Sequence, residues 1–253
     1  MIPDWQLPSG VDRGLFDYFR AAEMVRGYDE QMAASPLATA DVSFCERHFA
    51  KPGRLIDLGC GTGRLAGRFA QLGHDTVGVD LSDEMLKQAQ ANAGTLLVTW
   101  LNANIIDVTP AGGPFDYAAC LFSTWGMIRG RDQRRDMLTN VNRLLKPGGT
   151  FVLHVHNRRY ARLGWKRILN HELCALLGRA ETGDITMPQA YGGAPLTLHH
   201  ATAGEIRREL NEAGFRIIEM TGVDGEGNLR RPRRWSAGTY GYLAAVTCGE
   251  QEA

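Results

Sequence analysis

The sequence lacks the features that mark secreted, disulfide-linked or membrane-spanning proteins. No apolar run approaches the roughly 20 residues that are needed to cross a bilayer. The first ten residues, MIPDWQLPSG, contain neither the basic nor the apolar segment of a secretory signal, so no such signal is expected. The five cysteines are scattered, form no CxxC pair and fit reduced, buried thiols: Cys45, Cys60, Cys120, Cys174 and Cys248. We therefore expect a cytoplasmic protein without a membrane partner.

An excess of one charge is also missing. Lys and Arg together number 28, as do Asp and Glu, so no global field attracts nucleic acid or a membrane. Any electrostatic preference must come from a local patch. A chain of 253 residues, 44% of them hydrophobic, can form one large domain, or one domain with a lid, and bury a core without disulfides or metals.

Strands alternate with helices through the middle of the chain. Short apolar segments predict strands at 55–58, 76–79, 96–101, 115–122 and 150–155. Helical patterns separate several of them: a helix that ends near residue 72, one at 83–93, and one at 131–145 that stops at the sequence KPGG. This alternation predicts a doubly wound α/β fold with a mostly parallel sheet of seven strands, covered on both faces. Right-handed crossovers bring the carboxyl ends of the strands to one edge, where ligands bind.

We divide the chain into four regions. In chain order they are an N-terminal helical cap, a Rossmann-like ligand-binding core, an inserted lid and a C-terminal segment that completes the sheet: 1–50, 51–156, 157–202 and 203–253. The lid is inferred because the alternation lapses for too long to be a simple loop. The remaining expected elements are helices at 11–32, 36–49, 161–177 and 203–213, and strands at 215–220 and 239–247.

A glycine-rich motif, LIDLGCGTG at residues 55–63, leads from the first strand through G-x-G-x-G into a helix. Glycines allow the backbone to approach a ligand closely, and the free N–H groups of the helix start suit a carboxylate or phosphate. Asp80 closes the second strand, 17 residues after Gly63, where a carboxylate can accept hydrogen bonds from both hydroxyls of a ribose. The third glycine comes one residue earlier than in the dinucleotide motif G-x-G-x-x-G. This spacing argues against a nicotinamide or flavin enzyme.

These segments resemble the class I S-adenosylmethionine-dependent methyltransferases. LIDLGCGTG, VGVDLS followed by DEMLKQA, FDYAAC and LLKPGGTFVL occur in the family's order and spacing over residues 52–155. The resemblance implies S-adenosylmethionine as cofactor and S-adenosylhomocysteine as product. It also implies that Asp57 orients the amino group of the methionine part, that Asp80 binds the ribose and that Leu81 packs on the adenine. The alternative role of Asp57 is to cap the glycine loop. The full set of expected cofactor contacts is Tyr28, Asp57, Gly59, Cys60, Gly61, Gly63, Asp80, Leu81, Asn104, Ile105 and Leu121.

The chain departs from the family pattern after the third strand, where an acid usually holds the adenine amine. Asn104 stands there instead, and its side-chain carbonyl can accept a weaker, neutral hydrogen bond. Asp107 is the alternative acid, unless it is a solvated loop residue. Tyr28 begins a segment, YDEQM, that resembles an element folded over the cofactor in many small-molecule members. Tyr28 would then lie near the methionine carboxylate, and anchoring a helix in the core is its alternative role.

The segment after the fourth strand is expected to line a pocket for the methyl acceptor. Phe122, Trp125 and Met127 offer apolar walls for a small organic molecule, with an ordinary core position as the alternative.

Four histidines are expected near the same edge of the sheet. His154 and His156 share one face of the fifth strand, and His156 lies at its carboxyl end. His156, together with His199 or His200, is a candidate general base near neutral pH, whereas His154 is expected to be structural. No His-x-x-His or Cys-x-x-Cys spacing is present, so no metal is expected.

The lid is locally basic. Between residues 156 and 179 only Glu172 opposes a set of cations: Arg158, Arg159, Arg162, Lys166, Arg167 and Arg179. A second basic run, RRPRR, occupies residues 230–234 and is followed by Trp235. These charges form a solvated face or attract an anionic acceptor, such as a carboxylate, a phosphate or RNA.

The combined pattern predicts an enzyme that moves a methyl group from S-adenosylmethionine to an oxygen or nitrogen of a small molecule. The lid, residues 157–202, is expected to supply most of the surface that selects the acceptor. The alternatives are an RNA-modifying methyltransferase that uses the basic lid and a cofactor-binding protein without catalysis. The acceptor and the oligomeric state do not follow from the sequence.

Overall fold

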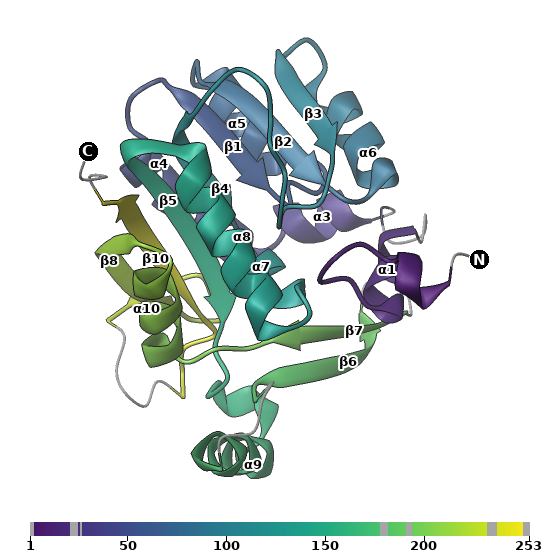
Figure 1. Ribbon diagram of the computed structural model, residues 1–253, viewed down its shortest axis with the longest axis vertical. Helices are drawn as coiled ribbons and strands as arrows, with labels where there is room; N and C mark the ends of the chain where they lie inside the picture. Colours follow the sequence, from purple (N-terminus) through teal and green to yellow (C-terminus); the bar gives the residue numbers. More distant parts are fainter. Residues whose placement is uncertain are drawn as a thin grey trace.

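Eight strands form one sheet in the order β3-β2-β1-β4-β5-β10-β8-β9 (Figure 1). The computed structural model describes residues 3–20, 25, 27–177, 182–190, 194–231 and 237–249. β1 to β5 are parallel, whereas β10 runs antiparallel between β5 and β8. The strands are β1 Arg54–Leu58, β2 Asp75–Asp80, β3 Val98–Asn102, β4 Phe115–Cys120, β5 Leu145–His156, β8 Phe215–Val223, β9 Leu229–Arg230 and β10 Gly241–Cys248.

The predicted doubly wound α/β fold is confirmed, but the sheet has eight strands instead of seven. The additional strand, β9, contributes two residues that pair with the end of β8. Two residues are too few to show an alternating pattern, so periodicity could not reveal this strand. β5 also begins earlier than expected, at Leu145, because the KPGG segment continues the strand through a shift in register against β4.

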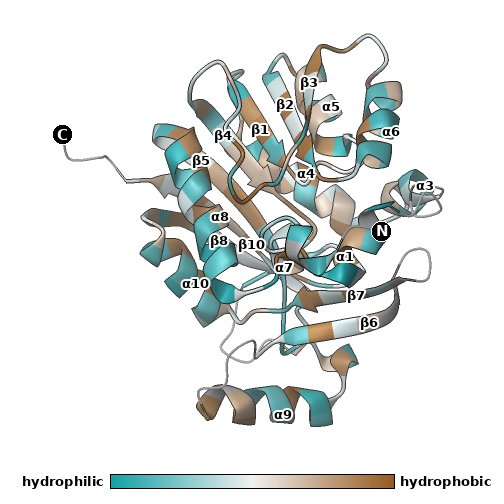
Figure 2. Ribbon diagram, turned by 45° about the vertical axis from the view of Figure 1, so that its right-hand side comes forward, coloured by the Kyte–Doolittle hydropathy of each residue, from teal (hydrophilic) through white to brown (hydrophobic). Residues whose placement is uncertain are grey.

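Two hydrophobic clusters cover the two faces of the sheet. The helices that the structure describes are η1 Asp4–Gln6, α1 Arg13–Arg20, α3 Tyr28–Ala33, α4 Pro36–His48, α5 Arg64–Gln71, α6 Asp83–Ala93, α7 Thr124–Met127, α8 Arg131–Leu144, η2 Ala161–Leu163, α9 Trp165–Leu176 and α10 Ala203–Glu212. α4 and α5 pack on one face, and α8 and α10 on the other. Every residue of β10 is buried, as expected for a central strand with helices on both sides. Figure 2 shows hydrophobic residues along the central strands and a mixture of hydrophilic and hydrophobic residues on the helices that cover them. None of the helices in the described part of the chain is both long and apolar enough to span a membrane.

The helix starts follow ordinary capping chemistry. The Ser35 hydroxyl accepts a hydrogen bond from the Ala38 amide at the start of α4, and Ser82 and Thr202 cap α6 and α10 in the same way. The single helix predicted over 11–32 is wrong. Gly27, at φ +74°, precedes α3 and separates it from α1, while residues 21–24 and 26 lie outside the described part.

The lid contains a β-hairpin that the sequence did not predict. After β5 the chain forms η2 and α9, which correspond to the helix expected at 161–177, and then the antiparallel strands β6 Asp184–Ala190 and β7 Ala194–His199. β7 lies beside α1 (Figure 1), and Leu15 and Tyr18 of α1 share a hydrophobic cluster with Leu196 and Leu198 of β7. The N-terminal cap and the lid therefore form one continuous cover.

Candidate cofactor and acceptor site

Three neighbouring cavities lie at the carboxyl ends of the parallel strands. The first, of about 690 Å³, is lined by Gly59, Gly61, Asp80, Leu81, Asn104 and Ile105 among others. The second, of about 470 Å³, is lined by Tyr28, Asp57, Cys60, Arg64, Leu121 and Phe122 among others. The third, of about 710 Å³, is lined by Phe122, Met127, His156, Tyr160, His200 and Tyr240 among others. The first two share Tyr28, Gly59, Thr124 and Met127, and the last two share Phe122 and Met127.

The three glycines of the loop have different roles, although all have positive φ. Gly59 leaves no room for a Cβ atom, which would overlap Thr124. Gly61 faces the first cavity, where a Cβ would meet only Tyr28, at 3.7 Å. Gly63 lies outside the first two cavities, and a Cβ there would be 2.6 Å from Trp100. The structure therefore gives Gly63 a packing role between α5 and β3, and its expected cofactor contact stays a prediction.

Asp80 ties the glycine loop to the end of β2. Its two carboxylate oxygens accept hydrogen bonds from the amides of Gly61, at 2.8 Å, and Ser82, at 2.9 Å. Burial raises its pKa, and these hydrogen bonds oppose that shift. Each carboxylate oxygen can accept a second hydrogen bond. Asp80 thus remains able to bind a hydroxyl in the first cavity.

Asn104 also lines the first cavity, but it is engaged in local structure. Its side-chain oxygen accepts from the amide of Ile106 at 3.1 Å, and its nitrogen donates to the carbonyl of Ser9 at 2.9 Å. Asp107, the alternative to Asn104, is exposed and does not line the cavity. The apolar walls that sequence reasoning missed come largely from α1, α6 and the turn before α8: Leu15, Tyr18, Met85, Ile106 and Ile128.

Asp57 is a buried carboxyl group in the second cavity. Burial raises its pKa to about 7, while the nearby charge of Arg64 works in the opposite direction. A buried carboxylate suits a cationic partner, because ionisation without one is unfavourable in an apolar environment. Tyr28, the first residue of α3, lines this cavity and the first.

A strained turn after β4 directs side chains into the second and third cavities. Phe122 and Ser123 have φ values of +51° and +65°, which are uncommon for residues with a Cβ. The Ser123 hydroxyl is fully buried and accepts a hydrogen bond from the amide of His156 at 3.3 Å. Trp125, by contrast, points into the core and donates to the carbonyl of Arg134 at 3.2 Å. Trp125 lines none of the three cavities, so the expectation that it forms an acceptor wall is not met.

His156 and His200 face each other in the third cavity, with ring centroids 5.2 Å apart. Burial, followed by the charge of His199, lowers the pKa of His200 to about 4. Burial and the two neighbouring histidines lower the pKa of His156 as well. Within the described part of the chain, Nε2 of His156 has no hydrogen-bond partner, and the ring of His200 makes its polar contact only with the backbone of Asn157. The third cavity therefore presents two neutral imidazoles at neutral pH.

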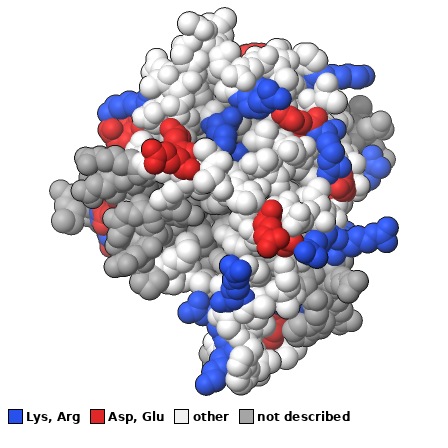
Figure 3. All heavy atoms as spheres, turned by 180° about the vertical axis from the view of Figure 1, so that it is seen from behind, with Lys and Arg blue, Asp and Glu red and all other residues white. Residues whose placement is uncertain are grey.

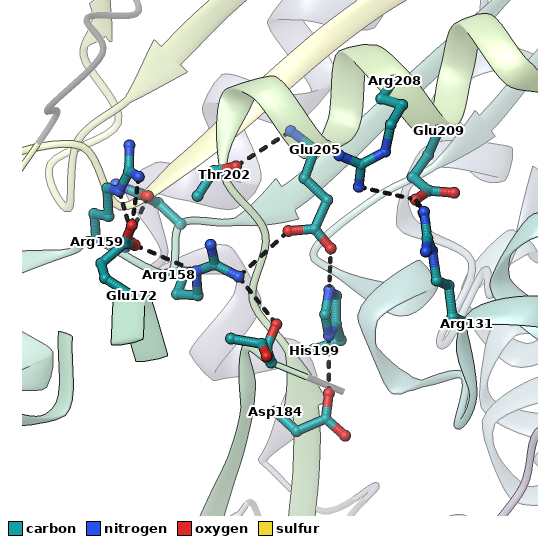
Figure 4. A network of polar contacts seen from close by, with 12 residues as sticks. Arg131, Arg158, Arg159, Glu172, Asp184, His199, Thr202, Glu205, Arg208 and Glu209 are labelled. Carbon is teal, nitrogen blue, oxygen red and sulfur yellow. Dashed lines mark hydrogen bonds and ion pairs between the residues drawn. The ribbon is translucent and has the colours of Figure 1, made fainter. Parts of the chain in front are cut away.

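His199, the other candidate base, lies outside the cavities and bridges two acids (Figure 4). Its Nδ1 is 2.8 Å from Asp184 of β6, and its Nε2 is 2.8 Å from Glu205 of α10. Burial opposes the charged form, but these hydrogen bonds outweigh it and raise the pKa of His199. With both nitrogens engaged, His199 connects the hairpin to α10 and is not free to act as a base. His154 is also structural in position, since it is fully buried with Nδ1 2.8 Å from Asp41.

The basic lid is partly neutralised. Arg159 binds Glu172 at 2.7 Å, and Arg158 lies 3.6 Å from both Glu172 and Glu205 (Figure 4). Arg230 pairs with Asp224 at 2.6 Å. Arg231 of this run is exposed, whereas its other two arginines and Trp235, which fall within 232–236, and residue 179 lie outside the described part. Over the described part of the face in Figure 3, basic and acidic side chains alternate without a continuous basic band.

Comparison with known proteins agrees with this geometry. Residues 55–149 match the model of a methyltransferase domain. This segment and the fold around it are similar to the class I S-adenosylmethionine-dependent methyltransferases. It is 30% identical over 131 residues to a putative methyltransferase, YqeM, of Bacillus subtilis, covering 51% of this chain and 53% of that protein. It is 30% identical over 132 residues to a ubiquinone biosynthesis O-methyltransferase of Methylococcus capsulatus, covering 50% and 52%. The chain thus spans about half the length of the curated relatives it matches.

Solved structures show the same fold over most of the chain. The CcbJ methyltransferase of Streptomyces caelestis superposes with a TM-score of 0.67 at 22% identity, over 91% of this chain and 99% of that one. A 1,6-didemethyltoxoflavin N1-methyltransferase of Burkholderia thailandensis, solved with its substrate and S-adenosylhomocysteine, gives a TM-score of 0.61 at 16% identity, over 98% and 93%.

The residues present fit S-adenosylmethionine as the cofactor. The joined first and second cavities provide apolar walls, a loop glycine without a side chain and two buried carboxyl groups, Asp80 and Asp57. A nucleoside that carries an amino-acid tail has the matching groups, namely a ribose and an ammonium.

Proposed function

We propose that the protein methylates an oxygen or nitrogen of a small, largely apolar molecule that binds in the third cavity. The observation that carries this proposal is that Phe122 and Met127 line both the second and the third cavity. The amino-acid end of the cofactor and the acceptor would meet at these two side chains. Bound S-adenosylmethionine supplies an already activated methyl group, so the protein chiefly has to align the acceptor with it.

His156 and His200 are proposed to hold the reacting group of the acceptor. Because burial keeps both rings neutral, their nitrogens can accept a hydrogen bond, and then a proton, from an attacking O–H or N–H. Tyr240 packs against the ring of His156, and Tyr160 packs against Tyr240 in the same cavity. Leucines and methionines of the hairpin complete the apolar wall and exclude water: Met187, Leu196 and Leu198.

The names of the relatives support a small ring-containing acceptor. One relative is a ubiquinone biosynthesis O-methyltransferase, and one structural neighbour methylates a nitrogen of 1,6-didemethyltoxoflavin. The ion pairs of Arg158 and Arg159 remove part of the charge that had favoured an anionic acceptor or RNA. Arg162 also lines the third cavity, so a hydroxylated or amino-substituted ring compound, neutral or singly anionic, is the acceptor class that the cavity favours.

The proposal is tested by incubating the purified protein and radiolabelled S-adenosylmethionine with a panel of phenols, hydroxyquinones and ring amines. His200→Phe should reduce turnover about 100- to 10,000-fold, the usual contribution of a general base, while calorimetry shows unchanged binding of S-adenosylhomocysteine. His171→Phe is the matched control, because His171 is half-buried on α9 and does not line the third cavity. Cofactor binding without transfer to any acceptor would indicate a protein without catalysis, and salt-sensitive methylation of RNA would favour the alternative enzyme.

A further inference from the structure

One charged side chain, Arg162, lines the third cavity within the described part of the chain. The other residues around this cavity are apolar, aromatic or amide side chains and the two neutral histidines. Arg162 belongs to η2, the short helix that follows the end of β5, and it is exposed to solvent. A guanidinium that borders a cavity and also reaches solvent lies at the mouth of that cavity. An anion can therefore reach Arg162 as it enters.

The acids that neutralise the neighbouring arginines do not neutralise Arg162. Arg159 binds Glu172 at 2.7 Å (Figure 4). Arg158 lies 3.6 Å from both Glu172 and Glu205. Arg162, by contrast, forms no ion pair with an acid that the structure describes. Among the described residues, its five N–H donors are therefore available to a ligand.

Further cations of the same segment add to the positive potential around the cavity. Lys166 and Arg167 follow in the first turn of α9, which contains no acid. Burial is the main cause of the lowered pKa of His200, and the charge of Arg167 adds to this shift, so Arg167 acts on the interior of the cavity. An anion that approaches η2 thus enters a locally positive potential, although Lys and Arg equal Asp and Glu in the whole chain.

A row of rings leads from the proposed reaction centre toward Arg162. His200 packs edge-to-face on His156, with ring centroids 5.2 Å apart. The ring of Tyr240 then contacts His156 at 4.7 Å and Tyr160 at 5.3 Å. Tyr160 immediately precedes η2, the helix that carries Arg162. The cavity therefore has neutral bases at one end of this row, aromatic walls along it and a cation beyond the other end.

We propose that the acceptor is an aromatic acid whose carboxylate binds Arg162, while its reacting hydroxyl or amine lies beside His156 and His200. This inference rests on the proposed function and adds the class of compound. A planar guanidinium binds a carboxylate through two parallel hydrogen bonds, which fix the orientation of the ligand as well as its affinity. One guanidinium matches one negative charge, so a carboxylate fits better than a doubly charged phosphate. Arg162 would select and orient the acceptor without taking part in the chemistry.

Calorimetry in the presence of S-adenosylhomocysteine measures acceptor binding without turnover and tests this proposal. The probes are 4-hydroxybenzoate, 4-hydroxyphenylacetate and 4-hydroxycinnamate, which place the carboxylate at increasing distances from the hydroxyl, each compared with its neutral primary amide. At least one carboxylate should bind about tenfold or more tightly than its amide, and high salt should reduce this preference because Arg162 is exposed. Arg162→Gln should abolish the preference. Lys166→Gln is the matched control, because Lys166 is an exposed cation of the same segment that does not line the cavity.

Turnover of the same probes separates this proposal from the proposed function. For a carboxylate that is methylated, Arg162→Gln should raise KM about tenfold with little change in kcat, because the guanidinium lies away from the transferred methyl group. Preferential binding of a carboxylate without methyl transfer would support the carboxylate site and count against the proposed function. Methyl transfer to neutral rings without any preference for a carboxylate, or failure of every carboxylate to bind, would overturn the carboxylate site. An equal loss of preference in Lys166→Gln would also overturn it, since a diffuse positive field would then select the acceptor.

Discussion

Binding of the cofactor should weaken as the pH falls from about 8 to about 5, because Asp57 must be ionised to hold the ammonium group of the methionine part. Burial raises the pKa of Asp57 to about 7, and the charge of Arg64 opposes this shift without cancelling it. Each pH unit below the pKa lowers the ionised fraction about tenfold. A hydrogen bond to a charged group contributes about 1.5–3 kcal/mol, so the loss should level off at about 10- to 150-fold.

Two ligands separate Asp57 from the rest of the site. Calorimetry with S-adenosylhomocysteine should show this decrease in affinity, whereas 5′-methylthioadenosine, which lacks the amino acid, should bind with little change over the same range. Asp57→Asn should bind S-adenosylhomocysteine weakly at every pH. Equal pH dependence for the two ligands, or an unchanged dependence in Asp57→Asn, would refute the assigned role.

The stability of the empty protein gives an independent check of the same pKa shift. The pKa of Asp57 is higher in the folded protein than in the unfolded chain, so ionisation at high pH favours unfolding. Asp57→Asn removes this effect and should raise the melting temperature at pH 8 more than at pH 5. An amide that destabilises the protein equally at both values would show that Asp57 is not buried in an unfavourable charged form.

Two further substitutions test the loop and the lid. Asp80→Ala should weaken binding of S-adenosylhomocysteine and of 5′-methylthioadenosine by about 1.5–3 kcal/mol, because the ribose loses a charged acceptor and the Gly61 amide loses its partner. Wild-type affinity in calorimetry would show that the ribose binds elsewhere. His199→Gln should lower the free energy of unfolding by about 2–4 kcal/mol near pH 6, or about 5–15 °C in melting temperature, since it breaks the bridge between Asp184 and Glu205. Because the pKa of His199 is raised, its contribution to stability is complete below about pH 6.5 and is lost as the pH rises through the raised value. On the acid side, the lowered pKa values of Asp184 and Glu205 confine the loss of this contribution to below about pH 4. A difference between wild type and variant that is as large at pH 9 as at pH 6 would contradict this account.

The core of the fold was predictable because its signals are local. Each strand from β1 to β5 contains a short apolar run, and the parallel arrangement then brings Gly61 and Asp80 to the same edge without further information. The resemblance to the methyltransferases rests on the same segments and is confirmed. The contacts of individual residues with the cofactor stay predictions, and Gly63 shows why. A glycine in a motif can serve either the ligand or, as here beside Trp100, the packing of a helix on a strand.

The acceptor side was less predictable because its geometry depends on contacts between distant segments. Phe122 and Ser123 adopt positive φ without being glycine, so nothing in the sequence marks the turn that sends Trp125 into the core. His199 and His200 are neighbours on an extended chain, and their side chains point to opposite sides. Only the position of the hairpin relative to α10 decides that His200 enters the cavity and His199 meets the two acids.

The shared cluster between α1 and β7 has a consequence for the order of events in a catalytic cycle. Leu15 and Tyr18 line the first cavity, while Leu196 and Leu198 of the same cluster line the third. Cofactor that settles beneath α1 therefore also steadies the wall against which the acceptor packs. We expect compulsory-order kinetics, in which the cofactor enters first and the demethylated cofactor leaves last. The acceptor wall is then complete only when a methyl donor is present, which limits unproductive occupancy of the enzyme.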